Sequence, residues 1–210
     1  MSVSLQIMEN VCKSRKILLQ LLQKRGYDTT PQDNFSDNEI RVLLGEKQLD
    51  FDLESKDEEN KKVFVKYLIN TKIRNTSLRS YINDFIDSQE DLEPKNTDII
   101  VILKDKPNES LLKVVDDFYS ENQIYINLIY IKTILFNILE HDYVPEHTKI
   151  SEHDYKILKQ NLNINSKSQL PLISRHDAVS TILGIRPGEV VKIVRSSKNA
   201  GQYLSYRCCK

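Results

Sequence analysis

Up to about Ile138, the spacing of apolar residues alternates between the period of a helix and the period of a strand. The run TDIIVIL at residues 97–103 is apolar throughout, which predicts a strand that is buried on both faces. Helices and strands that follow one another in this way are typical of an α/β domain with a mixed or parallel sheet. Helical spacing occurs in residues 7–22, 36–44, 78–86 and 110–119, and strand-like patterns occur in residues 48–55, 61–69, 97–103 and 126–131.

Short polar motifs predict where several helices begin. Ser36 precedes an apolar run and Glu39 stands where a capping box requires it, while Gly45 predicts a turn after this helix. Ser151 and Asp177 each precede a later helical run, where their side-chain oxygens can accept a backbone N–H group. These helices are therefore expected to begin directly after the capping residues.

After about Glu140 the pattern becomes richer in strands. The β-rich segments EVVKIVR and QYLSYR are separated by the turn SSKNAG, and the sequence RPGE predicts a tight turn in which Gly188 takes a positive φ. The whole chain is therefore predicted to be an α+β protein, with an N-terminal α/β domain and a small β-rich C-terminal domain. The predicted domains are residues 1–140 and residues 141–210.

Composition defines the class of protein. The chain of 210 residues has 40% hydrophobic and 29% charged residues, and no apolar run approaches the roughly 20 residues that span a bilayer. We expect no membrane segment and no export signal, and hence a reducing compartment. Cys12 stands alone, and Cys208 and Cys209 are neighbours, so neither a disulfide framework nor a structural zinc site is expected.

Charge is balanced over the chain but not along it. Lys and Arg number 30, as do Asp and Glu, so the net charge does not indicate nucleic acid. The C-terminal end is basic, which predicts a polarised surface there. Its basic residues are Arg175, Arg186, Lys192, Arg195, Lys198, Arg207 and Lys210.

Four blocks in the last third of the chain carry a family resemblance. HDYVPEHTKIS, SQLPLISRHDAV, GIRPGEVVKIVR and AGQYLSYR occur in this order, and KSRKILLQLLQKRGYDTTPQD stands near the front. Together they closely resemble the fifth-largest subunit shared by the eukaryotic nuclear RNA polymerases, whose C-terminal part corresponds to a small archaeal polymerase protein. Because that archaeal protein lacks the N-terminal part, the chain resembles the eukaryotic version or one carried by a large DNA virus.

This resemblance implies a division of labour within a DNA-directed RNA polymerase. Residues 1–140 would form a jaw with a nuclease-like mixed sheet beside downstream duplex DNA, and residues 141–210 would form an assembly domain on the largest polymerase subunit. Other polymerase subunits are further partners, whereas no homo-oligomer is expected. Catalysis belongs to other chains, so no catalytic residue, cofactor or metal is expected. The location would be the nucleus for a cellular version and the cytoplasm or the virion for a viral one.

The basic C-terminal end has two readings, an acidic surface on the largest subunit or nucleic acid. The resemblance implies assembly, which favours the first, because charge complementarity commonly steers protein association. Arg195 and Arg207 are the expected anchors, since a guanidinium can bind a carboxylate through two hydrogen bonds. The predicted assembly interface comprises Val144, Pro145, Glu146, His147, Arg186, Gly188, Lys192, Arg195, Tyr206 and Arg207.

The predicted DNA-facing loop of the jaw departs from the family. Subunits of this family in the nuclear polymerases commonly carry Thr-Pro-Ser-Ala after the buried strand. This chain has DKPNES there, and only the proline is shared. Lys106, Pro107 and Asn108 remain the candidates, because Lys106 can pair with a phosphate and Asn108 can donate to one.

One enzymatic reading and one binding reading are alternatives. A nuclease would use Asp50 or Asp52 with an acid two positions before Lys66, but that position holds Phe64, so the carboxylate cluster is broken. A free-standing adaptor that borrowed the assembly domain is the binding alternative.

Four neighbouring residues invite a metal reading, namely His141, Glu146, His147 and His153. Their spacing is not that of a ligand pair on one helix, and Pro145 prevents a continuous helix. The favoured reading is that the VPEH segment fixes the turn between the two domains.

Overall fold

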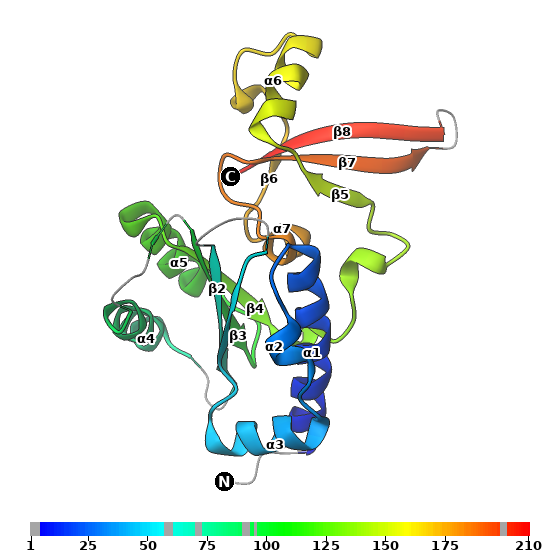
Figure 1. Cartoon of the computed structure of the whole chain (residues 1–210). Helices are drawn as coiled ribbons and strands as arrows, with labels where there is room; N and C mark the ends of the chain where they lie inside the picture. Colours follow the sequence, from blue (N-terminus) through cyan, green and yellow to red (C-terminus); the bar gives the residue numbers. More distant parts are fainter. Residues whose placement is uncertain (1–4, 57–60, 70–72, 90–92, 95, 198–200) are drawn as a thin grey trace. The chain divides into compact units, whose positions relative to one another are not determined.

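The computed structural model of the chain describes residues 5–56, 61–69, 73–89, 93–94, 96–197 and 201–210 (Figure 1). Lys198 and the rest of 198–200, in the predicted turn before the last strand, lie outside the described residues. Contacts divide the chain into two compact units, Met1–Phe136 and Asn137–Lys210, here called the N-terminal and C-terminal units. The 3-10 turn η2 (Ile138–Glu140) belongs to the C-terminal unit, although it precedes the predicted division at residue 140. No described helix is both long enough and apolar enough to cross a membrane.

The N-terminal unit is built on a four-stranded mixed sheet. The strand order is β1-β2-β3-β4, in which β1 is antiparallel to β2 and the other neighbours are parallel. Every residue of β3 is buried, which confirms the prediction of a strand covered on both faces. The strands are β1 (Phe51–Glu54), β2 (Lys62–Leu68), β3 (Thr97–Leu103) and β4 (Tyr125–Tyr130).

Helices lie on both sides of this sheet, with α4 and α5 on one side and α1 on the other (Figure 1). The side chains of Ile99, Val101 and Leu103 on β3 form one core cluster with apolar residues of α4 and α5. Because alternate residues of a strand point to opposite faces, Ile100 and Ile102 are buried on the other face. The helices are α1 (Leu5–Lys24), α2 (Thr30–Asp33), α3 (Asp37–Glu46), α4 (Asn75–Asp87) and α5 (Glu109–Asn122), and the 3-10 turn η1 is Ile131–Ile134.

The ends of α3 show one confirmed prediction and one that is wrong. Ser36 accepts a hydrogen bond from the Glu39 backbone while the Glu39 carboxylate accepts one from the Ser36 backbone, so the predicted capping box is present. The turn predicted at Gly45 is wrong, because the helix continues through Glu46. Lys47 ends it by adopting a left-handed conformation with φ of 60°, in which its N–H group bonds carbonyls of the preceding turn.

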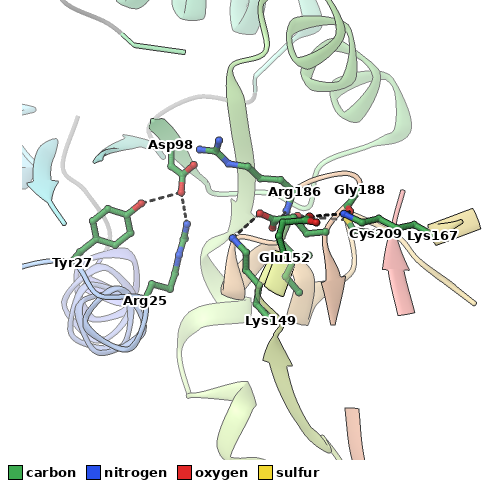
Figure 2. Close-up of polar contacts among 11 residues, drawn as sticks. Arg25, Tyr27, Asp98, Lys149, Glu152, Lys167, Arg186, Gly188 and Cys209 are labelled. Carbon is green, nitrogen blue, oxygen red and sulfur yellow. Dashed lines mark hydrogen bonds and ion pairs between the residues drawn. The ribbon is translucent and has the colours of Figure 1, made fainter. Parts of the chain in front are cut away.

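A buried ion pair joins Arg25, directly after α1, to Asp98 at the start of β3. Asp98 is 1% exposed, and its carboxylate accepts hydrogen bonds from Arg25 at 2.5 Å and from the Tyr27 hydroxyl at 3.0 Å (Figure 2). Arg25 compensates the buried negative charge of Asp98, and both donors replace the hydrogen bonds that water would otherwise make. Because the charge is stable only with these partners in place, the ion pair fixes the end of the helix at one position on the sheet.

The C-terminal unit holds a second four-stranded mixed sheet, in the order β5-β7-β8-β6. Only β6 is parallel to its neighbour, and β7 and β8 form a long antiparallel hairpin. With the first sheet, this arrangement confirms the predicted α+β class. The elements are β5 (Glu146–Lys149), α6 (Glu152–Asn161), the 3-10 turn η3 (Lys167–Gln169), β6 (Leu172–Ile173), α7 (Ala178–Leu183), β7 (Val190–Ser197) and β8 (Gly201–Cys209).

The base of the hairpin is buried on both faces. Val190 and Cys208 pack in a cluster with residues of α6, whereas Val191 and Cys209 pack in another with the segment that follows α7. Ser151 caps α6 and Asp177 caps α7, as predicted. Only the base of the hairpin is covered in this way, so its far end is left with exposed side chains.

Candidate functional site

The predicted assembly residues on the sheet of the C-terminal unit fall on opposite faces. In an antiparallel pair, residues directly opposite each other point to the same face. The pairing Lys192↔Tyr206 defines one face and Arg195↔Tyr203 defines the other. We call them the Lys192 face, formed by Glu146, Thr148, Lys192, Val194, Leu204 and Tyr206, and the Arg195 face, formed by His147, Lys149, Arg195, Tyr203, Ser205 and Arg207.

The Lys192 face carries an apolar pair, Val194 and Leu204, with the polar pair Ser196 and Gln202 beyond it toward the far end of the hairpin. Val194 lies opposite Leu204, which is 48% exposed. Tyr206 is half-buried and packs against the cluster that contains Val190 and Tyr155. Among the predicted interface residues, Glu146 and Lys192 contribute the charge on this face. A partner here would cover the apolar side chains of Val194, Leu204 and Tyr206 and meet the charges of Glu146 and Lys192.

The Arg195 face carries the expected anchors, but their surroundings differ. Arg195 is exposed and lies opposite Tyr203, which is 58% exposed. The guanidinium of Arg207 donates a hydrogen bond to the Leu172 carbonyl at 2.9 Å and so helps to hold β6 beside β8. His147 places its Nδ1 atom 2.6 Å from the Pro145 carbonyl. Arg195 is therefore more open to a partner than Arg207, which has a structural role within the unit.

The predicted turn at Arg186 and Gly188 is tightly held. The Glu189 N–H group donates to the Arg186 carbonyl at 3.0 Å, and Gly188 has φ of 84°, as a turn with glycine at its third position requires. The Gly188 N–H group donates to the Cys209 carbonyl at 2.9 Å, and its own carbonyl accepts from Lys167 at 2.9 Å (Figure 2). The backbone of Gly188 is thus occupied within the unit, and only its exposed Cα side can meet a partner.

An ion pair on each side of this turn adds to its rigidity. Lys149 on β5 pairs with Glu189 at 2.6 Å, and Lys167 pairs with Glu152 on α6 at 2.6 Å (Figure 2). Sequence reasoning did not identify these contacts, because their members are far apart along the chain. The turn therefore presents a preformed surface, which lowers the entropy cost of docking.

The VPEH segment leads into the sheet. Val144 and Pro145 are half-buried, and the Val144 N–H group donates to the His141 carbonyl at 2.8 Å in a turn that precedes β5. This turn lies inside the C-terminal unit, which begins at Asn137, and not at the division between the units, so the interdomain role expected for VPEH is not supported.

The histidines near this turn make separate local contacts. The Nδ1 atom of His141 accepts a hydrogen bond from the Tyr143 backbone at 3.2 Å, and its ring lies 5.7 Å from the Tyr143 ring. His153 is on the exposed surface of α6. Within the described ranges, no group of three or more His, Cys, Asp or Glu residues is placed to hold a metal ion.

The loop after β3 lies at one edge of the sheet in the N-terminal unit. Because β2 and β3 are parallel, their carboxyl ends meet at this edge, and α4 and α5 begin there. The side-chain oxygen of Asn108 caps α5 by accepting from the Leu111 N–H group at 2.9 Å. A phosphate would therefore meet the amide NH₂ group of Asn108, beside the exposed Lys106 and the half-buried Pro107.

Two hollows share Asn108 and Ile73 at this edge. One is lined by Lys104, Asp105 and Lys106 together with apolar residues of β2, β3 and α5. The other is lined by the first turn of α4 and adds Arg74, Asn75 and Thr76 to the predicted loop. Sequence reasoning missed these residues of α4, because only the parallel pairing of β2 and β3 brings them to the loop.

The nuclease alternative lacks the carboxylate that it needs. Asp50 lies 3.3 Å from the Lys66 ammonium and accepts from the Tyr67 N–H group at 2.9 Å. The residue that should complete a metal site, Phe64, instead packs edge-to-face on Phe85 with the ring centroids 5.1 Å apart. The Asp50 carboxylate is therefore held by the sheet, and Phe64 supplies no ligand.

Comparison with known proteins gives one family match and several relatives. Residues 136–209 match the family described as RNA polymerase Rpb5, C-terminal domain. The chain is 27% identical over 200 residues to DNA-directed RNA polymerase V subunit 5A of Arabidopsis thaliana, which covers 93% of this chain and 86% of that protein. It is 27% identical to DNA-directed RNA polymerases I, II, and III subunit rpabc1 of Dictyostelium discoideum, over 93% of this chain and 94% of that protein. It is also 26% identical to DNA-directed RNA polymerases IV and V subunit 5B of Arabidopsis thaliana, over 93% and 87% of the two chains.

The matches agree with the fold. The matched residues 136–209 correspond to the C-terminal unit, Asn137–Lys210, and the relatives span the N-terminal unit as well. Residues 136–209 thus match the RNA polymerase Rpb5 C-terminal domain family, and over most of its length the chain is similar to subunits of DNA-directed RNA polymerases.

Proposed function

We propose that this chain is an architectural, non-catalytic subunit of a multi-subunit RNA polymerase, docked through its C-terminal unit on the largest subunit, with its N-terminal unit beside downstream duplex DNA. The observation that carries the proposal is the agreement between the family match at residues 136–209 and the compact C-terminal unit at Asn137–Lys210. A compact unit with two small cores of its own can act as a fixed docking module.

Charge and shape of the C-terminal unit support docking on a protein. Neither β7 nor β8 contains an acidic residue, whereas Lys192, Arg195 and Arg207 lie on them. An acidic partner surface would complement this charge, and Val194, Leu204 and Tyr206 on the Lys192 face would supply apolar contact area. Since Arg207 also holds β6, we assign the main charged contact to Arg195.

The edge at the carboxyl ends of β2 and β3 supports the proposal for DNA. Arg74, Lys104 and Lys106 bring positive charge to the two hollows there, and Asn108 brings an amide donor. Contacts of this kind go to the phosphate backbone, which positions a duplex without reading its sequence. The N-terminal unit would thus help to hold DNA entering the polymerase.

Recovery of partners tests the proposal directly. The full-length chain, carrying an affinity tag, is purified from the cells in which it is naturally made, and the co-purifying proteins are identified by mass spectrometry. We expect the largest polymerase subunit and other polymerase subunits, in the nucleus for a cellular chain and in the cytoplasm or the virion for a viral one. Recovery with other proteins and without polymerase subunits would support the adaptor alternative and contradict the proposal.

A further inference from the structure

Strand β8 has an open edge over most of its length. Strand β7 pairs with it from Gly201 to Cys208, whereas β6 pairs with its other edge only at Cys208 and Cys209. Among the residues that the structure describes, no strand pairs with this outer edge between Gly201 and Arg207. Figure 1 shows the hairpin of β7 and β8 extending beyond α6 and α7.

The hydrogen bonds at the base of the hairpin show which backbone groups face outward. The Cys208 N–H group donates to the Pro171 carbonyl at 2.9 Å, on the outer side, and the Cys209 N–H group donates to the Glu189 carbonyl at 2.8 Å, on the side of β7. Along a strand in an antiparallel pair the direction alternates with each residue. The N–H and C=O groups of Gln202, Leu204 and Tyr206 therefore face outward along the unpaired edge.

This edge lacks the features that usually protect an exposed strand. Proteins blunt such edges with proline, bulges or charged side chains, because an unpaired ladder recruits other strands. From Gly201 to Tyr206 there is no proline and no charged residue, and the register with β7 is unbroken. Tyr203 and Leu204 are 58% and 48% exposed. The edge is therefore suited to receive another strand.

The two faces of the hairpin define the chemistry of that strand. A neighbouring strand places alternate side chains on opposite faces, so one set would lie beside Leu204 and Tyr206, and the other beside Tyr203 and Arg207. The first set meets the apolar side chains of Leu204 and Tyr206, with the polar Gln202 beyond them, and the second meets the surface that carries Arg195. A strand in which apolar and acidic residues alternate would complement both faces.

We propose that the outer edge of β8, from Gly201 to Tyr206, binds an extended segment of the largest polymerase subunit by strand addition, and that this segment alternates apolar and acidic residues. This inference rests on the proposed function, because it names the backbone contact through which the C-terminal unit docks. Strand addition obtains affinity from main-chain hydrogen bonds and specificity from alternate side chains. A second copy that paired through its own β8 edge would place its basic Arg195 face beside the first, because β7 and β8 contain no acidic residue, so it is the less complementary occupant.

Hydrogen exchange at single residues tests the inference in the free chain and in the purified polymerase that contains it. In the free chain, the amides of Tyr203 and Ser205 are protected by β7, whereas those of Gln202, Leu204 and Tyr206 exchange rapidly. In the polymerase, the second group becomes at least about tenfold slower, as expected for newly paired amides. The first group is an internal control within the same strand.

A pair of substitutions at Leu204 separates main-chain pairing from side-chain contact. Leu204→Pro removes an outward N–H group and leaves the bonds to β7 in place, since proline is tolerated at such positions of an edge strand. Leu204→Ala removes the side chain and keeps the N–H group. We expect Leu204→Pro to lower recovery of the largest subunit by about tenfold or more, and Leu204→Ala to lower it less.

The outcomes separate the inference from the proposed function. If the chain assembles into the polymerase but the outward amides stay unprotected, or if both variants assemble as the unaltered chain does, strand addition is overturned and the proposed function stands. If the unaltered chain does not assemble at all, both fall. Protection of these amides in a dimer of the free chain would assign the edge to a second copy and would also overturn the inference.

Discussion

Replacement of Asp98 by alanine is expected to destabilise the N-terminal unit strongly. The carboxylate is 1% exposed and accepts hydrogen bonds from Arg25 and Tyr27, so its loss leaves a guanidinium that is 10% exposed without its partner. Breaking a buried pair in this way costs about 3–5 kcal/mol of the free energy of unfolding. For a chain of this size, that corresponds to a fall of about 10 °C in the melting temperature.

Urea and thermal unfolding followed by circular dichroism measure this loss. The matched control is Glu54→Gln, which removes a carboxylate from an exposed ion pair with Lys62 and is expected to change the free energy of unfolding by less than about 0.5 kcal/mol. The double variant Arg25→Met/Asp98→Leu should recover most of the stability, because neither charge is then buried alone. If Asp98→Ala unfolded within about 1 kcal/mol of the unaltered chain, the reasoning about this pair would be refuted.

Three further predictions concern a helix cap, a thiol and the loop after β3. Ser36→Ala removes the capping box of α3 and should lower the free energy of unfolding by about 1 kcal/mol in urea titrations. Hydrogen bonds from the Ser36 side chain and backbone lower the pKa of Glu39 below its ordinary value. The stability from this contact is therefore present above the pKa of an unfolded glutamate and is lost as the pH falls through the lowered pKa. An NMR titration of Glu39 can follow this pKa. Burial raises the pKa of Cys209 to about 12, so iodoacetamide at pH 8 should label this thiol only after unfolding, as peptide mass spectrometry would show. In the assembled polymerase, Lys106→Ala should reduce the slope of log affinity for duplex DNA against log salt by about 1, whereas Lys113→Ala, at an exposed position of α5, should leave the slope unchanged.

Local chemistry made much of the fold predictable. The continuous apolar run at 97–103 predicts a strand buried on both faces, and the structure confirms it. The pair Ser36 and Glu39 predicts a capping box, which is also confirmed. Helix α4 begins at Asn75, before the start at Leu78 that the helical spacing predicts, because its first turn is polar and carries no apolar period. Glycine normally takes the left-handed conformation that ends a helix, which is why the turn after α3 is predicted at Gly45. In the structure Lys47 takes this conformation instead.

Features that depend on strand pairing could not be predicted. The register that places Lys192 opposite Tyr206 and Arg195 opposite Tyr203 divides the predicted assembly residues between two faces, and no local pattern contains that register. The position of Arg74 beside the loop at Asn108 could not be predicted either. It depends on the parallel pairing of β2 and β3, and the sequence pattern allows either a mixed or a parallel sheet. Resemblance to a family identified the C-terminal region, but only the sheet shows how its residues are arranged.

Cross-linking within a transcribing polymerase tests the central claim most directly. The polymerase is purified through a tag on a different subunit, shown to transcribe, and treated with a lysine-reactive cross-linker before mass spectrometry. The account predicts that this chain is present and that lysines of the C-terminal unit, such as Lys192 and Lys210, are linked to the largest subunit. Absence of the chain from active polymerase, or links from the C-terminal unit only to other proteins, would contradict it.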